Sequence, residues 1–373
     1  MSHKSVLITG GAGFIGAHVS NELLEHGYRV RVLDALVPQV HGPIGGRPDY
    51  LDSEVELVIG DIRNSQLLSR ALRGIDAVIH LVALVGVGQS MYQIEEYTSV
   101  NNGGTATLMQ VLSAKPVEAV VVASSMSVYG EGLYLNADGI PEAAPARTLD
   151  QLRAARWEIT DGLGRPLIPV PTPEDKTPAL ASVYALSKYD QERMTLMLSS
   201  AYGMRAAALR FFNTYGPYQA LSNPYTGVLS NFAARVLNGR APLIYEDGRQ
   251  KRDFVSVYDV ASACRLALES EHVDGEAFNI SSGQAMTVEE IARRTIRCLG
   301  SRDLEPEITG KYRVGDIRHC FADISRARSA LGWRPSIEIE QGLDDLAVWL
   351  EGRKASDRAI EAREELAVRG LMI

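Results

Sequence analysis

A tyrosine and a lysine stand four positions apart in the segment Tyr184-Ala185-Leu186-Ser187-Lys188. On a helix this spacing puts both side chains on the same face. A free tyrosine has a pKa of about 10, and a nearby ammonium lowers that pKa toward the range in which the phenolate acts as a base. The pair therefore predicts an acid–base centre, and the alternative is an ordinary exposed helix edge.

A run of hydroxyl side chains follows the apolar segment 119–123 and includes Ser124, Ser125 and Ser127. Doubly wound sheets bind ligands at the carboxyl ends of their parallel strands. Ser125 is therefore predicted to hydrogen-bond a substrate hydroxyl or a developing carbonyl oxygen. Taken alone, a serine-rich strand end is more often a turn.

A glycine-rich loop, GGAGFIG at residues 10–16, follows an apolar run at 5–9 and precedes a helical pattern. Glycines allow a tight turn and a close approach of the backbone to a pyrophosphate, which the helix N-terminus then binds. Asp34 ends the next strand-like segment about 20 residues downstream, where a carboxylate accepts hydrogen bonds from ribose hydroxyls and repels a 2′-phosphate. The combination predicts a dinucleotide site that prefers NAD to NADP.

The elements that must position these residues follow a regular alternation in the first half of the chain. Short Val/Ile/Leu runs predict strands at 5–9, 29–34, 55–59, 77–81, 119–123 and 205–211. Amphipathic patterns between and after them predict helices at 17–26, 66–73, 105–113 and 184–202. Buried strands alternating with helices indicate an α/β fold with a doubly wound parallel sheet of the Rossmann type.

The second half is mixed and predicts a smaller α/β substrate-binding lobe. Helices are expected at 228–237, 260–269 and 288–299, with a strand at 254–257 and a charged helical tail from Lys354. Thr287 and Glu290 have the spacing of a capping box at the start of the third of these helices. We therefore divide the chain into a dinucleotide-binding domain at 1–215, to which 254–280 return, and a lobe at 216–373.

A proline-rich insert at residues 131–181 interrupts the pattern, with a hairpin expected around Asp161-Gly162. It joins the strand bearing Ser125 to the helix bearing Tyr184, so both of its ends are held at the active-site edge. A loop of this length is expected to serve as a lid. The alternative, nearly as well supported, is a hairpin that faces outward and pads the surface or a dimer.

Composition excludes several classes of protein. The 373 residues carry 38 Lys plus Arg against 46 Asp plus Glu, a net charge of −8, which gives no overall basic footprint for nucleic acid or an anionic membrane. Apolar runs are shorter than the roughly 20 residues that span a bilayer, and the first residues lack a signal-peptide pattern. The three cysteines are widely spaced and predict neither a disulfide framework nor a metal site. A cytoplasmic protein is expected.

Several segments together resemble the extended short-chain dehydrogenase/reductases, in that family's order and over nearly the whole chain. They are GGAGFIG, Asp34, Gly60-Asp61-Ile62, VNNGGT at 100–105, SSMSVYG at 124–130, YALSK at 184–188, LRFFNTYGP at 209–217, RDFV at 252–255 and Gly315-Asp316-Ile317. The chain is most similar to the nucleotide-sugar 4-epimerases, especially the dTDP-L-rhamnose 4-epimerase branch. That closer likeness lies in SMYQIEEYTSVNN at 90–102, NPYTGVLSNF at 223–232 and the insert ending in PVPTPEDK.

The resemblance implies roles at matching positions. Tyr184 would be the acid–base and would also contact the cofactor, Lys188 would bind the nicotinamide ribose, and Ser125 would assist proton transfer and contact the substrate. The remaining NAD-binding positions would be Gly10, Gly13, Phe14, Ile15, Gly16, Asp34, Asp61, Ile62, Leu81, Val82, Ala83 and Asn101. Asn213 and Arg252 would hold the substrate diphosphate, while Arg313 and Asp316 would contact the nucleoside.

The tripeptide Ser125-Met126-Ser127 bears on the reaction. Dehydratases of this family place Asp-Glu directly after the catalytic hydroxyl, and decarboxylating relatives usually have a Glu in the tripeptide. Met126 cannot titrate and Ser127 is a poor general acid at neutral pH. This favours an epimerase that removes and returns the C4 hydride of a dTDP- or UDP-linked sugar through a 4-keto intermediate, with dTDP-L-rhamnose or another dTDP-6-deoxyhexose favoured as the substrate.

Three alternatives remain: a UDP-hexose or UDP-uronate 4-epimerase, a 4-ketoreductase with the same residues, and a catalytically idle NAD-binding scaffold. A homodimer is also expected. Its interface would be formed by the helices at 105–113 and 184–202, where Met194, Leu196, Met197 and Leu198 provide more apolar surface than one buried stripe needs.

Overall fold

The computed structural model describes residues 4–42, 45–221, 223, 225, 227–271, 273, 275–301, 303–313, 315–353, 355 and 357–372. Lys354, where the charged tail was expected to begin, and Pro224 and Thr226 of NPYTGVLSNF lie outside the described residues. Among the described helices, none combines the length and apolar character that a bilayer crossing requires. The described residues also contain no group of three or more His, Cys, Asp or Glu side chains arranged to hold a metal ion.

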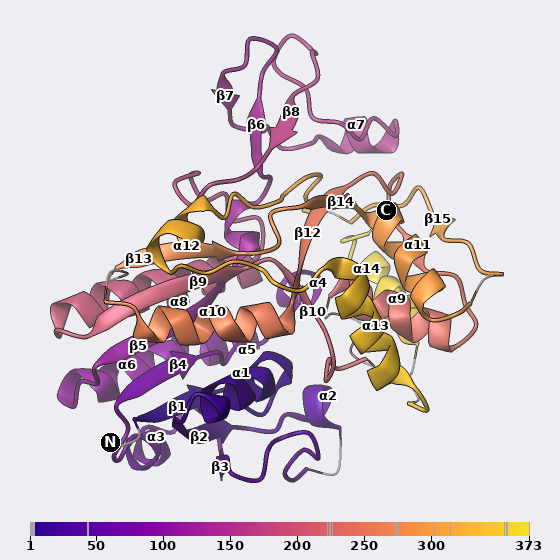
Figure 1. Cartoon of the computed structure of the whole chain (residues 1–373). Coiled ribbons are helices and arrows are strands. Elements are labelled where there is room, and N and C mark those ends of the chain that lie inside the picture. The colour runs from indigo at the N-terminus through magenta and orange to yellow at the C-terminus, as the bar shows by residue number, and fades with distance from the viewer. Residues whose placement is uncertain are drawn as a thin grey trace.

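A seven-stranded parallel sheet with the order β13-β9-β5-β4-β1-β2-β3 forms the centre of the larger lobe (Figure 1). Neighbouring side chains of a strand face opposite sides of the sheet, so Val6 and Ile8 join one core cluster while Leu7 joins another. The predicted doubly wound α/β fold is confirmed. Its strands are β1 (Ser5–Thr9), β2 (Arg29–Asp34), β3 (Glu56–Ile59), β4 (Ala77–His80), β5 (Ala119–Ser125), β9 (Arg205–Phe211) and β13 (Glu276–Ile280).

Helices cover both faces of this sheet. On one face α1 (Phe14–Glu25) packs along α10 (Val257–Glu269), and on the other α8 (Val183–Ala201) packs along α6 (Gly104–Ala114), which in turn contacts α3 (Ser65–Ala71). Residues 257–280 thus return to the first layer as α10 and β13. Short elements complete this lobe: α2 (Pro38–His41), α4 (Val87–Ser90), α5 (Ile94–Tyr97), the π-helix η1 (Thr98–Gly103), the 3₁₀-helix η2 (Met126–Tyr129) and α12 (Ser325–Ala330).

The second lobe has its own apolar core, which includes Phe232, Phe254, Ile291 and Leu346. Its strands form a three-stranded group, β10 (Asn213–Tyr215), β12 (Lys251–Ser256) and β14 (Ala285–Thr287), and a pair, β11 (Leu243–Ile244) and β15 (Glu307–Ile308). Its helices are α9 (Val228–Leu237), α11 (Val288–Cys298), α13 (Ile339–Leu350) and α14 (Ala359–Val368). The expected capping box is present, because Thr287 and Glu290 exchange hydrogen bonds at the start of α11.

The insert folds into a small antiparallel sheet of β7 (Pro141–Glu142), β6 (Leu133–Leu135) and β8 (Ile168–Val170), together with α7 (Leu149–Arg153). Figure 1 shows this sheet projecting from the top of the molecule, with α7 on the side of the second lobe. The hairpin expected around Asp161-Gly162 is observed, because Thr160 pairs with Pro166 and the Asp161 amide donates to the Arg165 carbonyl.

Two expectations need correction. The first helix begins at Phe14 and not at Ala17, because Gly13 already serves as its N-cap and the glycine loop leads directly into the helix. On α8, Leu196 is buried and Met194 and Leu198 pack against the core, whereas Met197 is 63% exposed. The apolar surface offered to a partner is therefore smaller than expected, and it also includes the exposed Leu186.

Candidate functional site

The glycine loop lies against the end of β4. Gly10 has a φ of 71°, and a Cβ there would lie 2.9 Å from the Val82 amide nitrogen. A Cβ on Gly16 would lie 2.4 Å from the Gly11 Cα. Both positions therefore require glycine. This packing brings residues 81–83 beside the N-terminus of α1, which no side chain caps, so its first-turn N–H groups suit an anion.

Asp34 ends β2 beside the same loop. One carboxylate oxygen accepts the Ala12 amide at 3.0 Å and the other accepts the Leu36 amide at 2.9 Å, while the His41 ring nitrogen Nε2 lies 3.6 Å away. The carboxylate is thus held at the carboxyl edge of the sheet by two backbone donors. This is the place that a ribose-binding carboxylate requires.

Asp61 and Ile62 follow β3 at the same edge. The Asp61 carboxylate pairs with Arg63 at 2.6 Å, and the hydrogen bond from Arg63 lowers the pKa of Asp61 below its ordinary value. Ile62 is buried against Gly104, where a Cβ would approach its side chain to 2.5 Å. The structure thus places the predicted cofactor positions around one edge, from β3 to the glycine loop.

Tyr184 is the second residue of α8, whose N-cap Ser182 accepts the Ala185 amide. The Ser125 hydroxyl accepts the Ser127 amide at 3.1 Å and hydrogen-bonds the Tyr184 oxygen. Burial raises the pKa of Tyr184 above its ordinary value, and the bond from Ser125 opposes that rise. The lowering of the Tyr184 pKa expected from Lys188 is not found, because burial dominates and Lys188 donates elsewhere.

Lys188 is only 3% exposed, and burial lowers its pKa to about 7. Its ammonium donates to Gln191 Oε1 at 2.8 Å, and the Gln191 amide donates to the Val82 carbonyl at 3.1 Å. Gln191 therefore ties the lysine to the loop after β4. Sequence reasoning missed this glutamine, although its i+3 position relative to Lys188 already places both residues on one helix face.

His80 ends β4 and is a buried residue of the core. Its ring bonds Thr9 Oγ1 at 2.7 Å and Thr105 Oγ1 at 2.9 Å. Burial, and then the positive charge of Lys188, lower the pKa of His80 to about 3. The neutral ring has both nitrogens hydrogen-bonded, and Nε2 also lies 3.3 Å from the Gln191 amide nitrogen that belongs to the Gln191–Lys188 pair. His80 is therefore no candidate for a base.

Asn101 lies in the π-helix η1, a form found mostly as short segments, frequently at functional sites. Its amide accepts the Leu84 N–H at 2.7 Å and donates to the Leu84 carbonyl and to Ser187 Oγ. The side chain thus connects the loop after β4 to α8. In this structure its geometry is that of a positioning residue between two predicted cofactor-binding segments.

A second buried network, which sequence reasoning missed, supports the end of β5. Arg210 pairs with both carboxylate oxygens of Glu192, at 2.7 and 2.9 Å, and donates to the Tyr129 hydroxyl. Ser124 also donates to Glu192, at 2.6 Å. These bonds connect α8, β9 and β5, and so fix the helix that carries Tyr184 against the strand that carries Ser125.

Two predicted substrate residues lie on neighbouring strands, because Asn213 of β10 pairs with Phe254 of β12 and Arg252 is two residues before it. The Asn213 Oδ1 atom is buried and has no partner among the described residues, as expected of an atom that awaits a ligand. The Arg252 guanidinium donates to the carbonyls of Lys251, Arg318 and Ile317.

Arg313 and Asp316 form an ion pair at 2.9 Å, and the Arg313 guanidinium lies 5.3 Å from the centre of the Tyr245 ring. This arrangement brings a flat aromatic side chain from the segment after β11 beside a cation and a carboxylate. Such a set can stack on a nucleobase and hydrogen-bond it.

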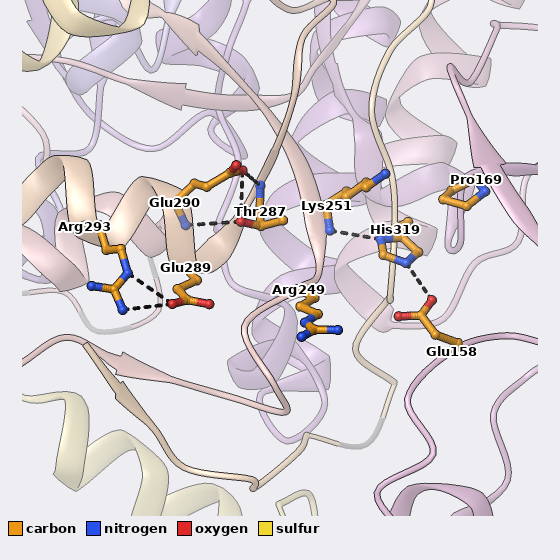
Figure 2. A pocket seen from close by; sticks show the side chains of 9 residues that line it. All are labelled: Glu158, Pro169, Arg249, Lys251, Thr287, Glu289, Glu290, Arg293 and His319. Atoms are coloured by element: carbon orange, nitrogen blue, oxygen red, sulfur yellow. Dashed lines mark hydrogen bonds and ion pairs between the residues drawn. The ribbon is translucent and has the colours of Figure 1, made fainter. Parts of the chain in front are cut away.

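A groove of about 560 Å³ lies elsewhere, between the insert and the second lobe. Figure 2 shows Glu158 of the insert bonded to His319, with Lys251 and Arg249 between them and α11. None of the predicted catalytic, cofactor or substrate residues lines it. The groove is therefore a separate surface feature, and it marks the contact of the insert with the second lobe.

Comparison with known proteins agrees with this geometry. A model of the NAD dependent epimerase/dehydratase family matches residues 6–149, and a GDP-mannose 4,6 dehydratase model matches residues 166–346. The chain is 36% identical over 352 residues to the dTDP-L-rhamnose 4-epimerase of Burkholderia thailandensis, and this alignment covers 93% of the chain and 95% of that protein.

Two solved structures are also similar over 93% of the chain. One is a UDP-glucose 4-epimerase of Thermotoga maritima with UDP-glucose, at 27% identity, a TM-score of 0.75 and 98% coverage of that protein. The other is a UDP-glucose 4-epimerase of Thermus thermophilus in complex with NAD, at 29% identity, a TM-score of 0.73 and 99% coverage.

Proposed function

Because the chain belongs to the NAD-dependent epimerase/dehydratase family, and is thus an enzyme with NAD as its cofactor, we propose that it is a nucleotide-sugar 4-epimerase. The proposed substrate is a dTDP-linked 6-deoxyhexose such as dTDP-L-rhamnose. One observation carries the reaction type: the hydrogen-bonded Ser125 and Tyr184 are accompanied in the tripeptide by Met126 and Ser127, neither of which is a carboxylate. The relative in Burkholderia thailandensis supports the choice of substrate.

The residues present suit NAD. The glycine loop and the uncapped N-terminus of α1 would receive the pyrophosphate, Asp34 the adenosine ribose, and Lys188 the nicotinamide ribose. Phe14, Ile15, Asp61, Ile62, residues 81–83 and Asn101 would border the cofactor. When bound, NAD accepts a hydride from the sugar C4 and returns it.

In the proposed reaction the Tyr184 phenolate, which the Ser125 hydroxyl stabilises and the positive charge of NAD would favour, takes the proton of the C4 hydroxyl, and Ser125 also hydrogen-bonds the developing carbonyl oxygen. The 4-keto sugar then turns within the site while Asn213 and Arg252 hold its diphosphate. Tyr184 returns the proton to the oxygen of the new epimer. Met126 and Ser127 do not titrate, so this chain has no second acid at that place to expel water from the sugar.

The division into a cofactor domain at 1–215, to which 254–280 return, and a substrate lobe over the rest of 216–373, with Arg313 and Asp316 at the nucleoside, is part of the proposal. So is a homodimer through α6 and α8, supported by the exposed Leu186 and Met197. A UDP-hexose 4-epimerase is the second candidate, and the two similar UDP-glucose 4-epimerase structures support it.

The deciding experiment is an NMR assay of the purified enzyme with a panel of dTDP- and UDP-linked hexoses, including 6-deoxy and uronic forms. We expect interconversion of C4 epimers without added cofactor, fastest for a dTDP-6-deoxyhexose, and NAD in the denatured supernatant. Fastest turnover of a UDP-sugar would favour the second candidate. Stoichiometric release of a reduced or dehydrated sugar would overturn the epimerase assignment.

A further inference from the structure

Glu246 of the second lobe has an unusual backbone and an unusual environment. Its φ is 53°, a region that residues other than glycine seldom occupy, and its side chain is only 2% exposed. Strained backbone of this kind persists where surrounding contacts hold it, and it concentrates at functional sites. Here the Glu246 amide donates to the Lys311 carbonyl at 2.8 Å.

Two arginines hold the Glu246 carboxylate, and one of them comes from the insert. Arg147 Nη1 donates to Oε1 at 2.8 Å, and Arg318 Nη1 donates to Oε2 at 2.9 Å. Arg318 is fully buried and also binds Glu158 and Asp247. The carboxylate is thus shared between the insert and the segment at 313–318.

Arg147 has a second contact that reaches the predicted nucleoside segment directly. Its Nη2 donates to the Asp316 carbonyl at 2.9 Å, and its side chain is 5% exposed. A planar guanidinium can donate along two directions at once, which an ammonium on a flexible stem does less well. The arginine thereby fixes the distance between Glu246 and Asp316.

The residues on either side of this bridge carry the predicted recognition surface. Tyr245 directly precedes Glu246 and lies under Arg313, and Arg313 pairs with Asp316. From the insert, the Trp157 ring meets the Tyr312 ring edge-on with centroids 6.1 Å apart. The insert therefore contacts the segment at 312–316 at two points.

The contacts of residues 133–170, the middle part of the insert, bear on whether the insert is a lid over the active site or a hairpin that faces outward. Among the described residues, the polar contacts that residues 133–170 make outside the insert go to the second lobe, to Glu246, Asp316, Arg318 and His319. None of these contacts goes to Ser125 or Tyr184. A segment held by buried ion pairs is suited to a fixed support and unsuited to repeated opening.

We propose that Arg147 is a positioning residue for substrate recognition, and that through it the insert fixes the Tyr245, Arg313 and Asp316 surface that binds the nucleoside diphosphate. The inference rests on the proposed function, which assigns Arg313 and Asp316 to the nucleoside. In this role of Arg147, the insert sets the affinity for the nucleotide and takes no part in hydride transfer.

The test compares Arg147→Met and Arg147→Lys with Arg153→Met in the intact enzyme. Arg153 lies six residues further along the insert and is exposed, and within the described part of the chain its ion-pair partner is Asp150, so its loss controls for removal of an insert charge. We expect both Arg147 variants to raise the KM for the dTDP-sugar and the Kd for dTDP alone about tenfold or more, with kcat within threefold and bound NAD unchanged. Arg153→Met should match the wild type.

Glu246→Gly supplies a variant that folds without the strained backbone, since glycine adopts a positive φ freely. It should also weaken dTDP binding about tenfold, because Arg147 then loses the carboxylate that holds its Nη1 atom. Calorimetric dTDP affinities equal to the wild type in folded Glu246→Gly would overturn the inference, as would a folded Arg147 variant with a reduced kcat and an unchanged KM. A wild-type enzyme that binds neither dTDP nor UDP would instead contradict the proposed function.

Discussion

The catalytic face of α8 and the contact between the insert and the second lobe are both buried and polar, but they are built differently. Around Lys188 most partners are uncharged: Gln191, a backbone carbonyl, and threonines that bond a neutral His80. Around Glu246 the partners are charged: they are Arg147 and Arg318, and Arg318 also binds Glu158 and Asp247.

The difference affects how each region responds to mutation. In the uncharged network around Lys188, short hydrogen bonds join residues whose helices and strands are already positioned by the parallel sheet. An ionic cluster holds together segments that no sheet aligns, and loss of one partner leaves an unpaired buried charge. Mutations in the first region should therefore mainly change chemistry, and mutations in the second should mainly change stability and binding.

Tyr184→Phe should have the largest effect. Loss of the phenolic oxygen removes the acid–base group, and we expect turnover to fall by about 10²–10⁴-fold or more while NAD stays bound, because its contacts lie elsewhere. The measurement is the NMR epimerisation rate together with the NAD content. Tyr202→Phe at the exposed end of α8 is the control. Activity of Tyr184→Phe within tenfold of the wild type would remove Tyr184 from the acid–base role.

Arg318→Met tests the ionic region. It leaves the buried Glu246 with one arginine and removes the arginine partner of Glu158 and Asp247, so the free energy of unfolding should fall by about 3–5 kcal/mol. Denaturant titration measures the change, and Arg249→Met, an exposed residue two positions after Asp247, should be nearly neutral. If both variants unfold at the wild-type midpoint, the cluster does not hold the insert.

Asp34→Ala should weaken NAD binding by about 10–100-fold, because charge-assisted hydrogen bonds to a ribose are lost, and should reduce the preference against NADP. Titration of cofactor-stripped protein with both dinucleotides gives the two affinities. Asp138→Ala, an exposed aspartate of the insert, should leave both unchanged. An unaltered NAD to NADP ratio in Asp34→Ala would place Asp34 outside the site.

Lys188→Met should change how stability depends on pH. The folded pKa of about 7 lies below the unfolded value near 10.4, so between these values the unfolded chain holds a proton that the folded chain has lost. The free energy of unfolding should therefore rise with pH in this window, by at most about 1.4 kcal/mol per pH unit from this group.

The Met variant should lack that component of the slope, whereas Lys4→Met, at an exposed position, should retain it. His18 and His80, with pKa values lowered by burial to about 4 and about 3, titrate below this window. Identical slopes for wild type and Lys188→Met above pH 7 would show that the lysine stays protonated.

Met197→Glu should have the smallest effect on the protomer, since Met197 is largely exposed on α8. If α6 and α8 form the proposed homodimer, a charge there should shift the protein to a monomer without unfolding it. Sedimentation at micromolar concentration measures this shift, with Leu163→Glu on the exposed insert as the control. A wild type that sediments only as a 40.6 kDa monomer would refute the dimer itself.

The sequence was most informative about structural features that depend on local residue spacing or on the arrangement of parallel strands. Six of the seven strands of the large sheet, all but β13, follow from patterns within a few residues, as do the capping box at Thr287 and the close packing of the glycine loop. The placement of Asp34 and Ser125 at one edge follows as well, because parallel strands bring their carboxyl ends together.

Only the tertiary structure decided which groups face one another across long separations. Burial sets the pKa of Tyr184 and Lys188, and neither burial nor the partner Gln191 can be inferred from a four-residue spacing. Arg147 meets Glu246 across 99 positions, and no periodicity of either segment encodes that contact. Local sequence patterns specify helices and strands because they act within one helical turn or one strand. Ion pairs between irregular segments depend instead on how the whole chain folds.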